Sequence, residues 1–199
     1  PGNWMGGYSH EPHTRPAEFA TDLETTLAIY PELEIVEGSY EDLMGDREGT
    51  IVGADVAKQY GWAVGKRVPI IQTIYAKEGG EAWEFNVRAI YSGADAKTDE
   101  SQFLFHWQYL NEAIKKRFGR KGDQVGFYIE RLVNPDDAAP VSKQLDGLFI
   151  NSLAETLTET EKAFQLGFIP MTELILVAIQ AVSFVVILII MAVMANTIA

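Results

Sequence analysis

Short runs of hydrophobic and polar residues through the first half of the chain predict alternating strands and helices. Four elements are expected in the order strand, helical turn, strand, helix: Glu34–Gly38, Tyr40–Met44, Thr50–Gly53 and Ala54–Tyr60. Val56 and Tyr60 lie four residues apart on one face of the predicted helix, and Gly61 follows as its terminator. Gly65 then provides the next turn.

A β-hairpin is predicted next, from Val68–Tyr75 and Trp83–Tyr91, because both runs are rich in β-branched and aromatic residues and a Gly-Gly turn separates them. Thr98–Ser101 offers an N-cap for a helix. The apolar stripe expected along that helix, ended by Gly119, consists of Phe103, Trp107, Leu110, Ile114 and Phe118.

The pattern downstream predicts one more strand and one more helix. Gln124–Val133 has strand composition, and Asn134-Pro135 has the order of a helix N-cap followed by proline at the first helical position. The core-facing residues expected on this helix are Val141, Leu145, Leu148 and Phe149.

These elements together predict an α+β fold, a small mixed sheet with helices packed on one side of it. Residues 1–33 show no sustained period and are expected to form an irregular lead-in, so the core domain is predicted to occupy residues 34–157.

A helical stalk is predicted over residues 158–170. Thr158 and Glu161 have the spacing of a capping box. A heptad-like seam continues from there into the C-terminal segment, through Leu157, Phe164, Phe168, Met171 and Ile175. Pro170 removes one backbone hydrogen bond and is a hinge candidate at the membrane boundary.

The C-terminal residues 171–199 are predicted to form a transmembrane helix. No side chain from Leu174 to Ala199 is charged, and about 20 apolar residues suffice to cross a bilayer. The residues that define the span and its small-residue packing face are Leu174, Val182, Phe184, Ile187, Ile190, Ala192 and Asn196. Because the chain begins without Met and ends without basic flanking residues, we expect a fragment truncated at both ends.

Composition narrows the functional class. The net charge of -12 disfavours a nucleic-acid partner, and the absence of cysteine excludes disulfides, thiol catalysis and cysteine-based zinc sites. The basic cluster at Lys115–Arg117 is expected to be a solvated helix C-terminus. Few basic residues precede the span, which favours an extracytoplasmic position for the domain.

No catalytic, cofactor-binding or metal-binding constellation is predicted. His10 and His13 flank a proline in an expected surface loop, and His106 is expected to be a partly buried, hydrogen-bonded core residue. The glycines near Gly119 lack the Gly-Lys-Ser/Thr ending of a phosphate loop. We therefore expect a protein without enzymatic activity of its own.

One stretch resembles a known family. Ile51–Ile70, which reads Ile-Val-Gly-Ala-Asp-Val-Ala-Lys-Gln-Tyr-Gly-Trp-Ala-Val-Gly-Lys-Arg-Val-Pro-Ile, resembles the strand, helix, glycine turn and strand of extracytoplasmic core domains in ABC transporter permeases of the MacB/FtsX/LolE type. Residues 158–197 are similar to that family's stalk and second transmembrane helix. Lys66 departs from the pattern, because many relatives carry Asp after the turn glycine.

The resemblance implies a permease subunit with four spans in the cytoplasmic (inner) membrane, with its large domain on the periplasmic side. It implies a cytoplasmic ABC ATPase and a second permease subunit as partners, besides membrane lipid, with no cofactor in this chain. ATP-driven movement of the spans would pass through the stalk to the domain. The alternatives are a single-pass anchored binding or signalling module and a membrane-bound hydrolase, whose catalytic constellation is not found.

Overall fold

The fold is described from a computed structural model. It describes residues 1–8, 16–72, 74–95, 98–119, 122–164, 179–187, 189–191 and 194. The chain forms two compact units, Pro1–Arg131 and Leu132–Ala199, and each is described by itself.

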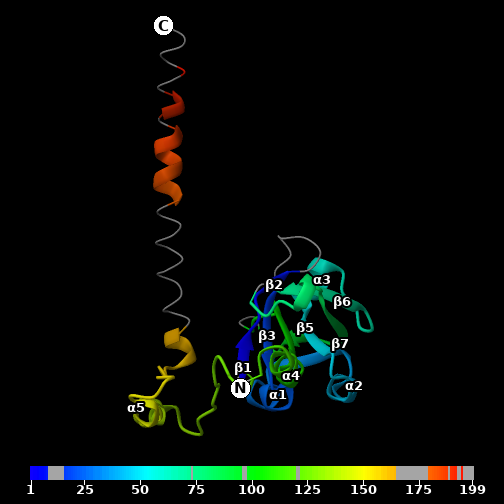
Figure 1. Cartoon of the computed structure of the whole chain (residues 1–199), viewed down its shortest axis with the longest axis vertical. Helices are drawn as coiled ribbons and strands as arrows, with labels where there is room; N and C mark the ends of the chain where they lie inside the picture. The colour runs from blue at the N-terminus through cyan, green and yellow to red at the C-terminus, as the bar shows by residue number, and fades with distance from the viewer. Residues whose placement is uncertain are drawn as a thin grey trace. The chain divides into compact units, whose positions relative to one another are not determined.

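An eight-stranded mixed sheet organises the first unit (Figure 1). Its strands are β1 (Gly2–Trp4), β2 (Gly7–Tyr8), β3 (Ala17–Thr21), β4 (Leu33–Gly38), β5 (Gly49–Gly53), β6 (Arg67–Gln72), β7 (Trp83–Gly93) and β8 (Gln102–His106). The strand order is β1-β3-β8-β5-β7-β6-β2, and β4 also pairs with β7. The β3–β8 and β5–β7 pairs are parallel and the others antiparallel, which confirms the predicted α+β class with a mixed sheet.

Helices cover both faces of this sheet, and the prediction of one covered face is wrong. The helices of this unit are α1 (Leu23–Ile29), α2 (Tyr40–Gly45), α3 (Ala54–Tyr60) and α4 (Trp107–Phe118), with the 3-10 turn η1 (Glu78–Gly80). On one face, α3 and α4 contribute Val56 and Leu110 to the larger apolar cluster. On the other, α1 and α2 contribute Leu23 and Leu43 to a second cluster. The central strands are therefore apolar on both sides.

The family-like stretch forms the predicted elements. β5 is followed by α3, whose C-cap Gly61 is left-handed at φ 61°. Gly65 turns the chain at φ 86° into β6, which pairs antiparallel with β7 as the predicted hairpin. Gly53 is also required where it stands, because a Cβ there would lie 1.9 Å from the Glu100 carbonyl oxygen.

Residues 1–33 are not an irregular lead-in. They supply β1, β2, β3 and α1, and β3 pairs in parallel with the central strand β8. The strands β1 and β2 are only three and two residues long, too short for a recognisable period-2 pattern. Their partners are distant in sequence, so tertiary pairing rather than local preference defines them.

The prediction that Phe103 begins a helical stripe is also wrong. Phe103, Leu104 and Phe105 are the central residues of β8 and are buried, with Phe103 and Phe105 in one apolar cluster and Leu104 in the other. An apolar run buried on both faces does not alternate, so its sequence is equally compatible with a buried helix. The helix α4 begins at Trp107 and ends at Phe118, and its C-cap is Gly119, the predicted terminator.

Gln124–Val133 does not form the predicted strand. Within its described residues only Phe127 pairs, through an isolated bridge to Gly2. The edge strand β1 is too short to pair with ten residues. Tyr128 and Val133 are exposed, so this segment also lacks an apolar face to bury.

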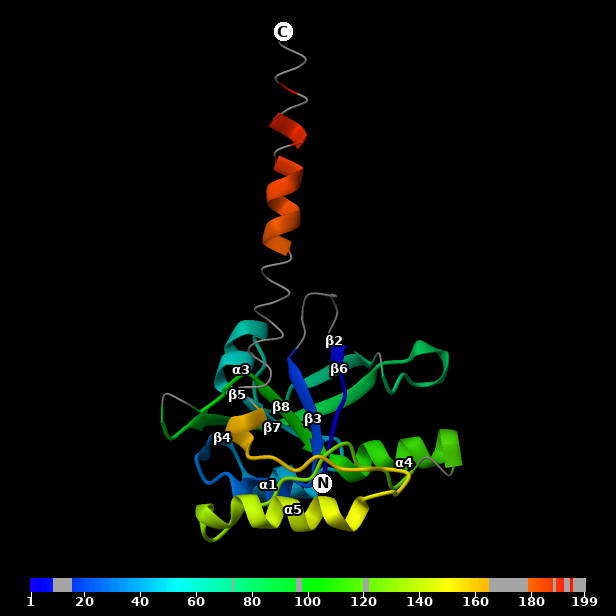
Figure 2. The ribbon, with the colours of Figure 1, turned by 90° about the vertical axis from the view of Figure 1, so that its left-hand side faces the viewer.

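The second unit contains the 3-10 turn η3 (Pro135–Asp137) and α5 (Ala138–Phe149) (Figure 2). The predicted cap is confirmed, because the Asn134 side chain accepts a hydrogen bond from the Asp136 N–H. The predicted inward face is wrong: no α5 residue is buried, and Leu148 is 75% exposed. Val141 and Leu145 are half-buried, and Leu148 and Phe149 are exposed.

Candidate functional site

The predicted stalk residue Thr158 lies in a polar junction with α5 rather than at a helix start. Its hydroxyl donates to Asp146 Oδ1 at 2.7 Å, and the Thr156 hydroxyl donates to the same oxygen at 3.0 Å. We call Asp146, Thr156 and Thr158 the Asp146 junction. It holds Thr156 and Thr158 against the last turn of α5, where the predicted stalk would begin.

Hydrogen bonding keeps Asp146 ionised. The Thr158 hydroxyl, with further contributions from the Thr158 N–H and the Thr156 hydroxyl, lowers the pKa of the Asp146 carboxyl against the opposing effect of desolvation. A carboxylate has only acceptor sites, so two converging hydroxyl donors suit its charged form. The Asp146 junction therefore consists of two charge-assisted hydrogen bonds between α5 and the segment that follows it.

The helix after the junction starts two residues later than the capping-box spacing predicts. Residues 161–164 are helical, and the Thr160 hydroxyl accepts from the Ala163 N–H at 3.2 Å as the N-cap. The Phe164 N–H donates to the Thr160 carbonyl at 3.0 Å, which closes the first turn. The Thr158 hydroxyl instead donates to Asp146, and Thr160 holds the N-cap position. Glu161 and Phe164 lie in that first turn, whereas Phe168 and Pro170 lie outside the described residues.

The predicted span is described only in part. Residues 179–187, 189–191 and 194 are helical and exposed. Four of the predicted span residues belong to them and have exposed fractions of 52–65%: Val182, Phe184, Ile187 and Ile190. Leu174, Ala192 and Asn196 lie outside the described residues. Within the described part, no helix reaches the length and apolar character needed to cross a bilayer.

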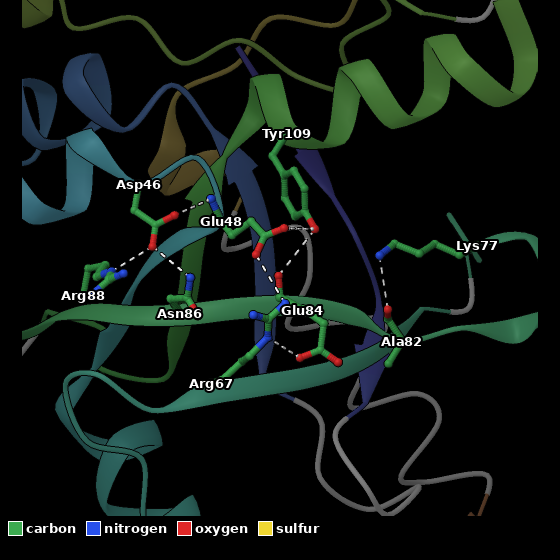
Figure 3. A network of polar contacts seen from close by, with 9 residues as sticks. All are labelled: Asp46, Glu48, Arg67, Lys77, Ala82, Glu84, Asn86, Arg88 and Tyr109. Carbon is green, nitrogen blue, oxygen red and sulfur yellow. Dashed lines mark hydrogen bonds and ion pairs between the residues drawn. The ribbon is translucent and has the colours of Figure 1, made fainter.

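A polar network ties the connection after α2 to the β6–β7 hairpin (Figure 3). Asp46 Oδ2 accepts from Arg88 Nε at 2.8 Å and from Asn86 Nδ2 at 2.9 Å. Arg67 Nε donates to Glu84 Oε2 at 2.9 Å. The Arg67 guanidinium also lies 3.5 Å from Glu48 Oε2, so it bridges two carboxylates.

The charges in this network compensate one another. Burial disfavours ionised Asp46, but hydrogen bonds from Arg88, Asn86 and the Glu48 N–H outweigh it and lower the pKa of this carboxyl. Burial and the nearby Glu48 charge raise the pKa of Tyr109 to about 12, so its hydroxyl stays protonated. We interpret the network as structural support for the hairpin.

The histidines and clustered acids of the described residues do not form a metal site. They contain no group of three or more His, Asp and Glu side chains arranged to hold a metal ion. His106 is half-buried with Nε2 2.9 Å from the Leu43 carbonyl oxygen, as predicted for a hydrogen-bonded histidine. His10 and His13 lie outside the described residues.

Asp146 is the residue that sequence reasoning missed. In the sequence it is one of 28 acidic residues, and its partners follow ten and twelve positions later. That spacing exceeds the three or four residues over which side chains meet along a helix. Only the reversal of the chain after α5 brings Asp146 to the threonines, and no local pattern announces that reversal.

No protein-family model matches the sequence, and no curated protein matches it. Among solved structures, similar chains include a domain of a protein assigned as a permease from Porphyromonas gingivalis, with a TM-score of 0.46 and 8% identity over 82% of this chain and 65% of that one. Another is the periplasmic region of MacB from Actinobacillus actinomycetemcomitans, with a TM-score of 0.43 and 13% identity over 74% of this chain and 64% of that one.

The description of the first neighbour names a permease, and that of the second names the periplasmic region of MacB. The chain spans about 65% of the length of each of them. Likeness of this degree carries no inference about activity, substrates or partners.

Proposed function

We propose that this chain is the extracytoplasmic domain, stalk and membrane-spanning segment of an ABC-type permease subunit in the cytoplasmic membrane. In this proposal, ATP hydrolysis by a cytoplasmic ATPase moves the spans of a permease dimer. The segment after Thr158 transmits that movement to the domain, which acts on a substrate or a partner outside the membrane.

The observation that carries the proposal is the order of parts along the chain. A domain containing the family-like strand–helix–strand unit precedes the Asp146 junction, and an uncharged apolar segment follows. Described helical residues of that segment expose apolar side chains, among them Val182, Phe184 and Ile187. Water is an unfavourable solvent for such a helix, so lipid or other spans suit it better.

The Asp146 junction supports transmission in particular. A lever needs a defined attachment, and a flexible linker would dissipate the movement of the span. Thr156 and Thr158 both bond to Asp146, so two points of the segment are fixed to α5 rather than one.

We expect Asp146→Ala to uncouple the domain from ATP turnover. In the full-length permease reconstituted with its ATPase, ATP should change amide hydrogen exchange within residues 1–131 of the wild type. The alanine variant should hydrolyse ATP but lose that change, because both hydroxyl contacts disappear. Asp146→Asn keeps an acceptor oxygen and should retain part of the response.

Asp137→Asn serves as the matched control, because Asp137 is an exposed acid at the start of the same helix without a side-chain cap bond. If Asp146→Ala shows the same ATP-dependent change in hydrogen exchange as the wild type, the Asp146 junction does not transmit the movement. If ATP does not change amide hydrogen exchange within residues 1–131 of the wild type, the proposed function itself is contradicted.

A further inference from the structure

Two buried side chains in the first unit face each other with one hydrogen bond between them and one acceptor left over on each. Glu18 of β3 is 0% exposed and Gln72 of β6 is 3% exposed. Gln72 Nε2 donates to Glu18 Oε2 at 2.9 Å. The other oxygens, Glu18 Oε1 and Gln72 Oε1, are buried without a hydrogen-bond partner among the described residues. Two acceptors cannot bond to each other without a proton.

The backbone closes tightly around this pair. Gly7 of β2 donates its N–H to the Glu18 carboxyl, and a Cβ at Gly7 would lie 2.6 Å from both Glu18 Oε2 and Gln72 Nε2. Gly7 pairs with Gln72 across the β2–β6 ladder, and Phe103 is opposite Glu18 in β8. The pair therefore lies where β2, β3 and β6 meet, at the edge of the larger apolar cluster.

No described cation compensates a charge on Glu18. Five ionisable side chains on the elements around it have partners other than Glu18: Arg67 with Glu84, His106 with the Leu43 carbonyl, Glu112 with Arg47, Lys115 with Asp123 and Tyr109 with Glu48. Desolvation raises the pKa of Glu18 from its ordinary value of 4.5 to about 7, against the lowering effect of the Gln72 and Gly7 hydrogen bonds.

Protonation of the Glu18 carboxyl gives both unpaired oxygens, Glu18 Oε1 and Gln72 Oε1, a hydrogen-bond partner. Its O–H can donate to the amide oxygen while its other oxygen accepts from the amide N–H, so acid and amide bond in a closed ring. The carboxylate form leaves a buried charge and an unpaired amide oxygen instead, which is the costly state for a group shielded from water.

We propose that Glu18 and Gln72 form a proton-binding acid–amide pair that secures β2 to β3 and β6, and that loss of the proton loosens this edge of the sheet. The device responds to the pH of the compartment around the domain. It needs no ligand other than a proton, and it is independent of the Asp146 junction.

The sign of the pH dependence follows from the protonation states. Between pH 4.5 and about 7 the folded chain holds a proton that the unfolded chain has released. Stability contributed by Glu18 is thus fully present below 4.5 and is lost as pH rises through about 7. The folded-to-unfolded ratio is expected to fall on the order of 100-fold across this interval.

Carbon-13 NMR of the 199-residue chain in detergent micelles, with labelled glutamate and glutamine side chains, tests the proposal. One glutamate carboxyl is expected to titrate with a midpoint near 7, and the Gln72 side-chain amide should shift with the same midpoint. This titration needs no variant. Every glutamate titrating near its ordinary value of 4.5 would overturn the proposal.

Glu18→Gln provides a second, independent test, because a neutral amide at this position imitates the protonated acid. Urea denaturation of this variant should lack the stability loss between pH 5 and 8, and amides of β2 and β6 should exchange more slowly than in the wild type at pH 8. Glu37→Gln, an exposed acid in β4, should keep the wild-type pH dependence. If the stability of the wild type and that of Glu18→Gln depend on pH in the same way, the proposed proton-binding role of the Glu18–Gln72 pair is contradicted.

Discussion

Replacing Val186 and Ile187 together by lysine is expected to release the chain from membranes. Fourteen Leu, Ile, Phe and Val residues lie between Leu174 and Val193, and at about 0.3–0.6 kcal/mol each they favour insertion by about 4–8 kcal/mol. Each central lysine costs about 2.5–3.5 kcal/mol and also removes one apolar contribution. Two lysines thus offset most or all of the gain. Alkaline extraction of membranes, followed by detection of the chain in the soluble fraction, measures the effect.

The matched control replaces the same two residues by leucine, which keeps both positions apolar. This variant should stay in the membrane pellet with the wild type. A double-lysine variant that also stays there would show that the segment from Leu174 is not the membrane attachment.

Phe85→Ala is expected to destabilise the first unit by about 3–5 kcal/mol, the range for deleting a buried phenylalanine ring. Phe85 is 1% exposed, and its ring centroid lies 4.7 Å from that of Phe105 and 5.1 Å from that of Phe103. The loss is a large part of the total stability of a typical domain. Urea unfolding followed by tryptophan fluorescence measures it, because Trp62 and Trp83 are buried in the same cluster.

Phe149→Ala is the control for this prediction, since Phe149 lies on α5 with 41% of its surface exposed. Its truncation removes the same atoms without opening a buried cavity. The urea midpoint of the first unit should therefore stay close to the wild-type value. Similar losses in both variants would contradict the assignment of the core to the cluster around Phe85.

Local pattern was sufficient to predict the elements from β4 to the β6–β7 hairpin, because each is short and bounded by a turn or cap residue. Gly61 and Gly65 both adopt the positive φ that their predicted roles require. The same reasoning failed for β8, where Phe103 to Phe105 are buried on both faces and periodicity carries no information. It also failed for β1 and β2, whose partners are remote in sequence.

The functional residues were harder to predict than the fold. Thr158 was selected for its capping-box spacing, yet its hydroxyl binds Asp146 and Thr160 caps the helix instead. Both hydroxyls suit either role, and only the path of the chain after α5 decides between them. Glu18 carried no signal at all, because a single acid in a short strand is ordinarily a solvent-facing residue.

Cysteine labelling in intact cells tests the central claim most directly, because the chain has no cysteine of its own and a single introduced one reports without background. Lys143 is exposed on α5, and Ile187 lies in the predicted span. With the outer envelope permeabilised, a membrane-impermeant maleimide should label Lys143→Cys from outside while Ile187→Cys stays unlabelled until detergent is added. Labelling of Lys143→Cys only after cell lysis would contradict an extracytoplasmic domain, and ready labelling of Ile187→Cys in intact cells would contradict the span.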